Sequence, residues 1–371
     1  MRLSFSVAVL SLFFACIFQI ISAHEPDSAH GLQSVFDKKL ITTRLTAKAI
    51  IDNHDNYDTA QAHTKRFKEG VTLAYVTPWN NHGYDVVKYF KGKFDYVAPV
   101  WGEQKYELTG GHDVDKGWMD EVRGQVNGKL VGKIVPRFQF QAWSRDDLVA
   151  LIQSESEWDS LIHLLTEECK KHDFNGLVLE SGIPGYLNLF LGRLYKQLHA
   201  YDRELIVVIP PIREDSQQNL NEEVIRKLTT VVDYLSLMTY DYSSQKPAGG
   251  ANAPIDWMED NILDLTNDGN RHKLLLGLNM YGMDYTGRAP PEAVTGLRLL
   301  VIMRKFSTTL TWDKESEEHL LEYTDEQDAT HKLWTPTLKS LEARIHLAED
   351  YEVGLSIWEV GQGLDYFYDL F

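Results

Sequence analysis

The sequence contains few cysteines and few basic residues relative to acidic ones. Its 371 residues include two cysteines, so neither a disulfide framework nor a zinc site of four thiolates is available. Its 37 lysines and arginines are outnumbered by 54 aspartates and glutamates, which gives a formal net charge of −17 at pH 7. Nucleic acid is therefore not an expected partner, because phosphate binding needs a basic surface.

Long apolar runs are also scarce, and the one that occurs lies at the N-terminus. The run Val7–Ile21 follows Arg2 and ends in small residues up to Ala23. A membrane-spanning helix needs roughly 20 apolar residues, so this pattern predicts a secretory signal peptide over residues 1–23 in preference to a signal anchor. We expect secretion, with the lysosome as an alternative or additional destination, and no membrane span.

The residues that most often bind metals form no convincing cluster. The mature chain retains Cys169, which lies in a helical pattern and is expected in the core. His112–Asp115 and the acidic stretch Lys314–Asp328 lack the ligand spacing of zinc and calcium sites. Both are expected on solvated surfaces, and no metal or other cofactor is predicted.

From residue 71 onward, short apolar runs alternate with amphipathic segments. Continuous apolar runs are typical of parallel strands that are buried on both faces. Eight such units predict a (β/α)8 TIM barrel, whereas an open doubly wound sheet lacks its glycine-rich loop after the first strand. The expected strands are Val71–Thr77, Phe94–Val100, Leu130–Phe138, Gly176–Glu180, Leu205–Pro210, Val232–Tyr240, Leu274–Asn279 and Val353–Trp358.

Two segments do not fit the repeat. Residues 24–70 are polar and are interpreted as an N-terminal leader outside the barrel, which then covers residues 71–371. The gap between the seventh and eighth strands is too long for one helix. Residues 286–336, approximately, are therefore expected to form a small α+β insertion, with a helix at Val294–Arg304. Helices between the strands are expected at Asp146–Leu151, Trp158–Lys171, Leu187–His199 and Glu222–Leu228.

In a barrel of this kind the site is expected where the strands end. Aromatic side chains and carboxylates converge there, a mixture that suits a glycan better than a phosphate ester, since aromatic faces stack on sugars. Arg137 also lies there, where it could contact an anionic sugar or pair with Glu107 or Glu180. The candidate ligand-binding residues are Tyr75, Trp79, Trp101, Glu180, Met238, Tyr240, Asp241, Tyr281, Trp358 and Glu359.

Several of these motifs resemble glycoside hydrolase family 18, the chitinase family. Residues 238–241, Met-Thr-Tyr-Asp, resemble its sixth-strand motif, and residues 353–361 resemble its eighth strand. Residues 174–182 lie where the family carries Phe-Asp-Gly-X-Asp-X-Asp-X-Glu. The resemblance implies a pocket for N-acetylhexosamine glycans, in which Tyr240 and Asp241 hold the acetamido group and Trp358 forms the floor.

The fourth strand departs from the family motif. The family's general acid, a Glu, is replaced by Gly182, and an inward Asp is replaced by Val178. Strand alternation predicts that Val178, Glu180 and Gly182 point into the barrel. The resemblance then implies a lectin that binds chitooligosaccharides without cleaving them.

Two alternatives remain at this point. One is an active hydrolase with a displaced acid, Glu180 or Glu107, although a structural role for Glu180, bonded to Tyr240 or a barrel hydroxyl, is favoured. The other is a protein-recognition role, because the resemblance implies an endocytic sorting receptor as a partner.

Overall fold

The computed structural model describes residues 33–371, apart from 105–106, 109–114, 127, 141–142, 214–219, 247 and 288–289, and gives only the backbone for 101–104 and 107–108. The predicted signal peptide and the first part of the leader lie outside the described residues. Within the described part of the chain, no helix combines the length and apolar character needed to cross a membrane.

Eight parallel strands close into a barrel, as the sequence predicts. The strand order is β1-β17-β11-β10-β9-β8-β7-β2, and β2 pairs again with β1, which closes the ring. All eight predicted apolar runs contribute to it. The barrel strands are β1 Thr72–Val76, β2 Tyr96–Gln104, β7 Arg137–Phe140, β8 Gly176–Glu180, β9 Glu204–Ile209, β10 Tyr234–Leu237, β11 Leu274–Asn279 and β17 Gly354–Trp358.

The third expected strand, Leu130–Phe138, is not continuous. Gly132 has a φ of +66°, a left-handed conformation that interrupts an extended strand, and Pro136 has no N–H to donate. The run is therefore divided into two pieces that pair with β2 and one that forms a separate hairpin. The pieces are β6 Lys133–Ile134 and β7 on β2, and β5 Lys129–Val131 paired with β4 Gly124–Val126; the short β3, Glu107–Leu108, also pairs with β2.

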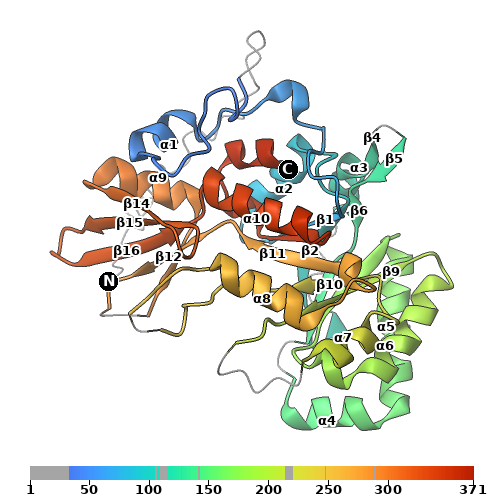
Figure 1. The fold of residues 1–371 in the computed structure, drawn as a ribbon. Coiled ribbons are helices and arrows are strands. Elements are labelled where there is room, and N and C mark those ends of the chain that lie inside the picture. The colour runs from blue at the N-terminus through green and yellow to red at the C-terminus, as the bar shows by residue number, and fades with distance from the viewer. Residues whose placement is uncertain are drawn as a thin grey trace, which may run out of the picture. The chain divides into compact units, whose positions relative to one another are not determined.

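Helices surround the barrel and cover its outer face (Figure 1). The four helices expected between strands correspond to α4, α5, α6 and α7. The helices are α1 Ala47–Asn53, α2 Asn81–Tyr89, α3 Lys116–Val122, α4 Arg145–Gln153, α5 Glu155–Lys171, α6 Asn188–His199, α7 Glu222–Leu228, α8 Ile255–Leu265, α9 Gly296–Lys305 and α10 Leu338–Asp350. Short 3-10 turns are η1 Thr59–Gln61, η3 Pro184–Tyr186, η4 Arg271–Lys273, η5 Val360–Gln362 and η6 Asp365–Leu370.

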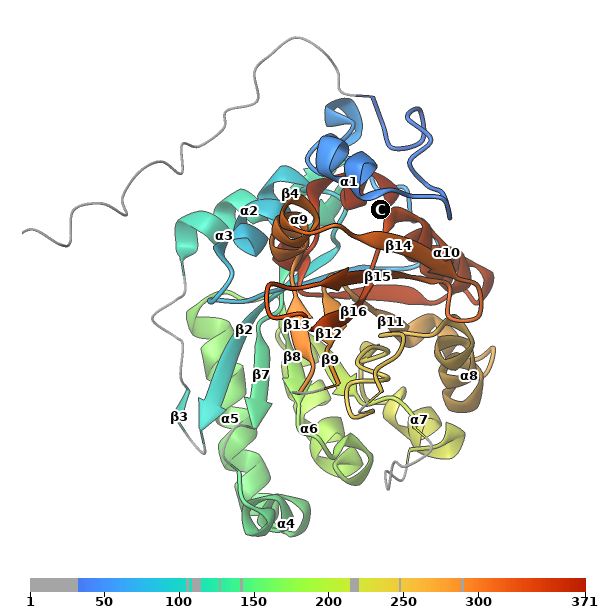
Figure 2. The ribbon, with the colours of Figure 1, turned by 90° about the vertical axis from the view of Figure 1, so that its left-hand side faces the viewer.

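The long gap before β17 contains a second sheet. Its five antiparallel strands run in the order β13-β12-β16-β15-β14, and the expected helix at Val294–Arg304 is α9 (Figure 2). The sheet includes β12, which lies before residue 286, so it extends further toward the seventh barrel strand than the sequence pattern indicates. The strands are β12 Gly282–Tyr285, β13 Glu292–Val294, β14 Thr309–Asp313, β15 Glu318–Thr324 and β16 Thr330–Thr335.

The core has two parts, one outside the barrel wall and one inside it. The larger cluster lies between strands and helices, and Val35, Ile50 and Phe67 of the segment before β1 belong to it. The inner cluster fills the barrel, so that its interior is a packed core and not a pore, as in other barrels of this size. It consists of Leu73, Tyr75, Tyr96, Ala98, Val100, Val135, Val178, Ile206, Val208 and Leu275.

Candidate functional site

A cavity of about 180 Å³ lies at the mouth of the barrel, above the inner cluster. Its residues come from β1, β7, β8, β9 and β17 and from the turn after β10, so six of the eight units contribute. This is the end at which TIM barrels place their sites. The lining residues are Tyr75, Arg137, Glu180, Val208, Met238, Tyr240, Asp241 and Trp358.

One side of the cavity is an ion pair between neighbouring strands. Arg137 Nε donates to Glu180 Oε2 at 2.8 Å, and its Nη2 lies 2.5 Å from the same oxygen. Gln139 Nε2 donates to Glu180 Oε1 at 3.1 Å. The guanidinium also lies over the ring of Trp358, 5.3 Å from its centroid. Both Glu180 oxygens are therefore occupied by donors from the protein itself.

Asp241 also lines the cavity. Its φ of +61° places it in the left-handed region, which Asp tolerates better than most residues. Its main-chain N–H donates to Asn252 Oδ1 at 3.0 Å, and the Tyr281 hydroxyl donates to its Oδ1. Burial raises the pKa of Asp241, against the opposing effects of the Tyr281 hydrogen bond and Arg213. Contacts to the main chain and to the side chain of Asp241 thus hold its carboxyl group at the cavity.

Aromatic rings form the floor. The rings of Tyr75 and Trp358 are 5.3 Å apart, and the Tyr75 hydroxyl donates to Ser236 Oγ at 2.9 Å. Burial raises the pKa of Tyr75 and of Tyr240, so both hydroxyls keep their protons. Tyr75 donates its proton to Ser236, whereas the Tyr240 hydroxyl can donate to a ligand. An apolar floor with hydroxyl and carboxyl groups around it is a surface on which a sugar ring can lie.

Most of the residues expected to bind ligand meet at this cavity. Tyr281 adjoins it through its bond to Asp241. The sequence pattern gave no indication of Val208 or Asn252, since neither stands in a motif. The expected residues that line the cavity are Tyr75, Glu180, Met238, Tyr240, Asp241 and Trp358.

Other candidates lie elsewhere. Trp79 is 67% exposed and does not line the cavity. Glu359 is fully buried behind Trp358, where its carboxylate accepts from Asn80 Nδ2 at 2.7 Å and from the N–H of Gly361 at 3.0 Å. Glu359 is therefore a buried support of the β17 end and not a residue of the cavity. The side chain of Trp101, like that of Glu107, lies outside the described residues.

Gly182 also departs from its expected orientation. Strand β8 ends at Glu180, and Gly182 has a φ of +73°, so the alternation that places Val178 inside the barrel does not continue to Gly182. A Cβ built on Gly182 would meet no heavy atom within 4 Å. The position is open space beyond the strand.

The described residues contain no group of three or more His, Cys, Asp or Glu side chains that could hold a metal ion. The segment His112–Asp115, which was expected to be solvated, lies outside the described residues except for Asp115. Cys169 is buried, and burial raises the pKa of its thiol to about 12.

Comparison with known families identifies the barrel. The family model described as glycosyl hydrolases family 18 matches residues 143–363, more than half of the chain. The chain belongs to glycosyl hydrolase family 18. The matched stretch includes Gly182, Asp241 and Trp358, so the departures at β8 lie inside the family 18 region.

Related proteins are distant. The cortical fragment-lytic enzyme of Bacillus subtilis is 24% identical over 241 residues, which are 62% of this chain and 56% of that enzyme. The enzyme of the same name from Bacillus anthracis is 24% identical over 137 residues, 35% of this chain and 32% of the enzyme. The chain therefore spans about half or less of the length of these relatives.

Solved structures share the family 18 fold. A chitinase from Chromobacterium violaceum superposes with a TM-score of 0.68 at 20% identity, over 81% of this chain and 97% of that one. The spore cortex-lytic enzyme of Bacillus megaterium gives 0.65 at 18% identity, over 81% of this chain and 72% of that one. A Group IV chitinase from Ostrinia furnacalis gives a TM-score of 0.61 at 14% identity, over 81% of this chain and 98% of that one.

Proposed function

We propose that the chain is a chitinase-like lectin that binds chitooligosaccharides or other N-acetylhexosamine-containing glycans, bacterial cell-surface saccharides among them, without cleaving them. One observation carries this proposal. The cavity retains Tyr240, Asp241 and Trp358, whereas the position of the family's general acid is Gly182, which has no side chain.

The chemistry of the cavity favours binding. Trp358 and Tyr75 offer aromatic faces to the C–H groups of a sugar, and Asp241 offers an oxygen to its hydroxyl or amide hydrogens. Tyr240 offers a hydroxyl donor to a carbonyl oxygen. These are the groups that an acetamido sugar needs, and the family resemblance assigns the acetamido contact to Tyr240 and Asp241.

The same cavity is poorly equipped for hydrolysis. Loss of a general acid typically lowers the rate by about 10²–10⁴-fold. Glu180 is the carboxylate that could replace it, but Arg137 and Gln139 occupy its oxygens. The arrangement agrees with the Arg137–Glu180 ion pair considered from the sequence, and it argues against Glu180 as a displaced acid.

The finer identity is also a proposal. The motifs at residues 75–79, 82–85, 237–243, 277–285 and 361–369 resemble chitinase domain-containing protein 1, a chitinase-like branch of the family. Relatives named as chitinases and as cortex-lytic enzymes support a saccharide ligand. Secretion or lysosomal delivery, and an endocytic sorting receptor as partner, stay predictions from the sequence.

Titration of the purified chain with chitotetraose tests the function. Tryptophan fluorescence reports binding at Trp358, and an assay of reducing ends in the same samples reports cleavage. We expect a saturable change in fluorescence with no new reducing ends. Release of reducing ends at ordinary chitinase rates would overturn the lectin assignment, and no fluorescence change would leave the chain without its proposed ligand.

Asp241→Ala is the variant that examines the cavity directly. Removing the carboxyl deletes a charged hydrogen-bond partner, which is worth about 1.5–3 kcal/mol, so we expect roughly ten- to hundred-fold weaker binding of chitotetraose. Asp284→Ala is the matched control. Asp284 is also buried, but its Oδ2 accepts from the Tyr323 hydroxyl and faces His331, outside the cavity. Equal losses of affinity in both variants would contradict the assignment of the cavity.

A further inference from the structure

A buried ion pair joins the insertion to α10, outside the cavity. Glu318 on β15 and Arg344 on α10 are each about 3% exposed, and Arg344 Nη2 is 3.1 Å from Glu318 Oε1. The expectation that the acidic stretch Lys314–Asp328 is solvated is therefore wrong at Glu318, because Arg344 pairs with it. Taking two charges out of water is costly, and such a pair persists only where further hydrogen bonds satisfy it. The partners of these two side chains therefore show what the pair holds together.

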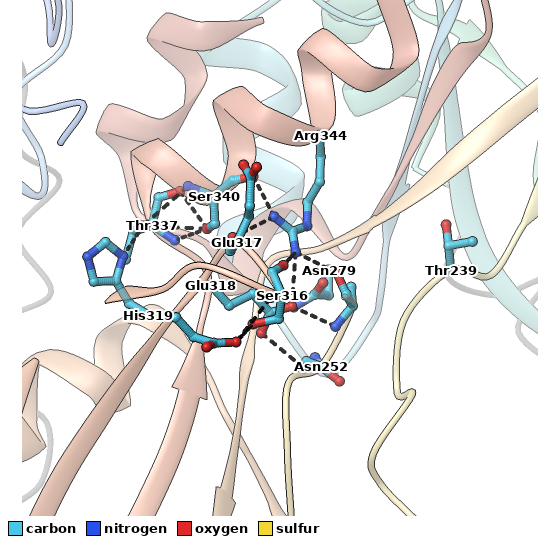
Figure 3. Close-up of polar contacts among 12 residues, drawn as sticks. Thr239, Asn252, Asn279, Ser316, Glu317, Glu318, His319, Thr337, Ser340 and Arg344 are labelled. Carbon is cyan, nitrogen blue, oxygen red and sulfur yellow. Dashed lines mark hydrogen bonds and ion pairs between the residues drawn. The ribbon is translucent and has the colours of Figure 1, made fainter. Parts of the chain in front are cut away.

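The partners of Glu318 are main-chain groups of the loop after β10. Its Oε2 accepts from the N–H of Asn252 at 3.0 Å, and its Oε1 accepts from the N–H of Ala253 at 2.6 Å. Figure 3 shows the side chain reaching Asn252 on one side and Arg344 on the other. A strand of the insertion thus fixes a loop that belongs to the barrel.

Arg344 holds the other side of this junction. Its Nη1 donates to the carbonyl oxygens of Glu317 and Ser340, both at 2.8 Å. Its Nη2 donates to the carbonyl oxygen of Ala253. It also donates to that of Ser316 at 3.0 Å (Figure 3). The planar guanidinium joins α10, the start of β15 and the barrel loop in one network, which a lysine cannot reproduce.

The loop transmits this anchoring to the cavity. Asn252 is fully buried, its Oδ1 accepts from the N–H of Asp241 at 3.0 Å, and its carbonyl oxygen accepts from the N–H of Tyr242 at 2.9 Å. Asp241 is in a left-handed conformation, which a residue with a side chain adopts more readily when local hydrogen bonds support it. One chain of bonds therefore connects Arg344 to the carboxyl that lines the cavity.

We propose that Glu318 and Arg344 are positioning residues for saccharide binding, which act through Asn252 to hold Asp241 at the cavity. This inference rests on the proposed function. On this inference the insertion contributes to saccharide binding, although none of its described residues lines the cavity.

Glu318→Gln tests the inference. The substitution replaces one acceptor oxygen with an NH2 group that faces a main-chain N–H, and it leaves Arg344 without its counter-charge. We expect about ten-fold weaker binding of chitotetraose, measured by tryptophan fluorescence at a temperature where circular dichroism shows the variant folded. Arg344→Lys, which keeps the charge and loses the planar fork, should weaken binding in the same direction and replaces Glu318→Gln if that variant does not fold.

Asp95→Asn is the matched control. Asp95 is a buried carboxylate near the start of β2, where it pairs with Lys65 and Lys129 and accepts from the N–H of Thr72 at 2.9 Å. It should lower the melting temperature without changing the affinity. If Glu318→Gln also lowered only the melting temperature and kept the wild-type affinity, the pair would be purely structural and the inference would be wrong.

Hydrogen exchange of residues 241–253, without any ligand, separates this inference from the proposed function. We expect faster exchange in Glu318→Gln than in the wild type or Asp95→Asn. If the wild type fails to bind chitotetraose, the proposed function fails, and with it the role in saccharide binding. The exchange data then decide whether the pair fixes the loop, and unchanged exchange would refute that as well.

Discussion

At the scale of single residues, a carboxylate of the site can bind ligand only where the protein's own donors do not already occupy its oxygens. From the sequence, Glu180 was expected to bind ligand. The other interpretations were a displaced catalytic acid, a partner of Tyr240 or a barrel hydroxyl, and a partner of Arg137. The structure shows the ion pair with Arg137. Glu359 was expected at the ligand and instead supports the β17 end, bonded to Asn80 and to the main chain of Gly361.

Glu359 also makes stability depend on pH. Burial raises its pKa to about 7, although the bonds from Asn80 and Gly361 and the nearby His82 oppose the shift. An unfolded glutamate has a pKa of about 4.3, so between about pH 4.5 and 7 the folded chain holds a proton that the unfolded chain has released. The stability that protonated Glu359 contributes to the folded state is fully present below about pH 4.5, and it is lost as the pH rises to about 7.

Glu359→Gln should remove that dependence, because an amide can still accept from Gly361 and carries no charge. Urea unfolding at pH 4.5, 6 and 7.5 gives the free energy of unfolding of the variant and of the wild type. We expect the variant to gain stability relative to the wild type as the pH rises. Parallel stability curves for the two proteins would show that Glu359 does not titrate in this window.

At the scale of elements, helix α10 illustrates how local sequence and tertiary contacts combine. Its N-terminus carries a capping box in which Thr337 and Ser340 exchange side-chain to main-chain bonds. The Thr337 hydroxyl also lies 2.9 Å from His319 Nδ1 on β15. The cap thus fixes both the helix that carries Arg344 and its contact with the insertion.

Thr337→Ala and Ser144→Ala compare this cap with an exposed one. Ser144 makes a capping box with Asp147 at the start of α4 and, within the part of the chain that the structure describes, has no contact comparable to His319. Losing a cap costs about 1 kcal/mol, and leaving a buried partner unsatisfied adds about 1–3 kcal/mol. Urea unfolding should therefore show a larger loss for Thr337→Ala, and an equal or smaller loss would contradict the role of His319.

At the scale of the whole barrel domain, its two ends in sequence are joined by one carboxylate. Asp369 Oδ2 accepts from the N–H of Val35 and its Oδ1 from the N–H of Asp58, both at 2.9 Å. Residues 33–70, read from the sequence as a leader, are therefore tied to the last turn, η6. The same segment contributes Phe67 to the main core.

Asp369→Ala should loosen this segment. Two hydrogen bonds to a carboxylate are lost, each worth about 1.5–3 kcal/mol, so hydrogen exchange in residues 33–70 should become faster while the barrel strands change less. Asp37→Ala is the control, because Asp37 bonds to Ser34 within the segment. If both variants left exchange in residues 33–70 at the wild-type rate, the junction would not hold the segment in place.

The barrel and much of its mouth were predictable because their signals are local and repeated. Each buried strand is an apolar run, and the ends of parallel strands meet at one face whatever their separation in sequence. That is why Tyr75, Asp241 and Trp358 could be expected together. The β12 strand was missed because its four buried residues begin at Gly282, soon after β11 ends at Asn279, and look like a continuation of the barrel strand.

The sequence by itself determined the strand and helix alternation, the closed barrel and the absence of a carboxyl at position 182. Only the tertiary structure decided which groups are satisfied by the protein and which remain at the cavity. Glu318 and Asn252 are 66 residues apart, and Val35 and Asp369 are 334 apart. No local pattern encodes such pairs, because burial and hydrogen bonding depend on the neighbours that the completed fold supplies.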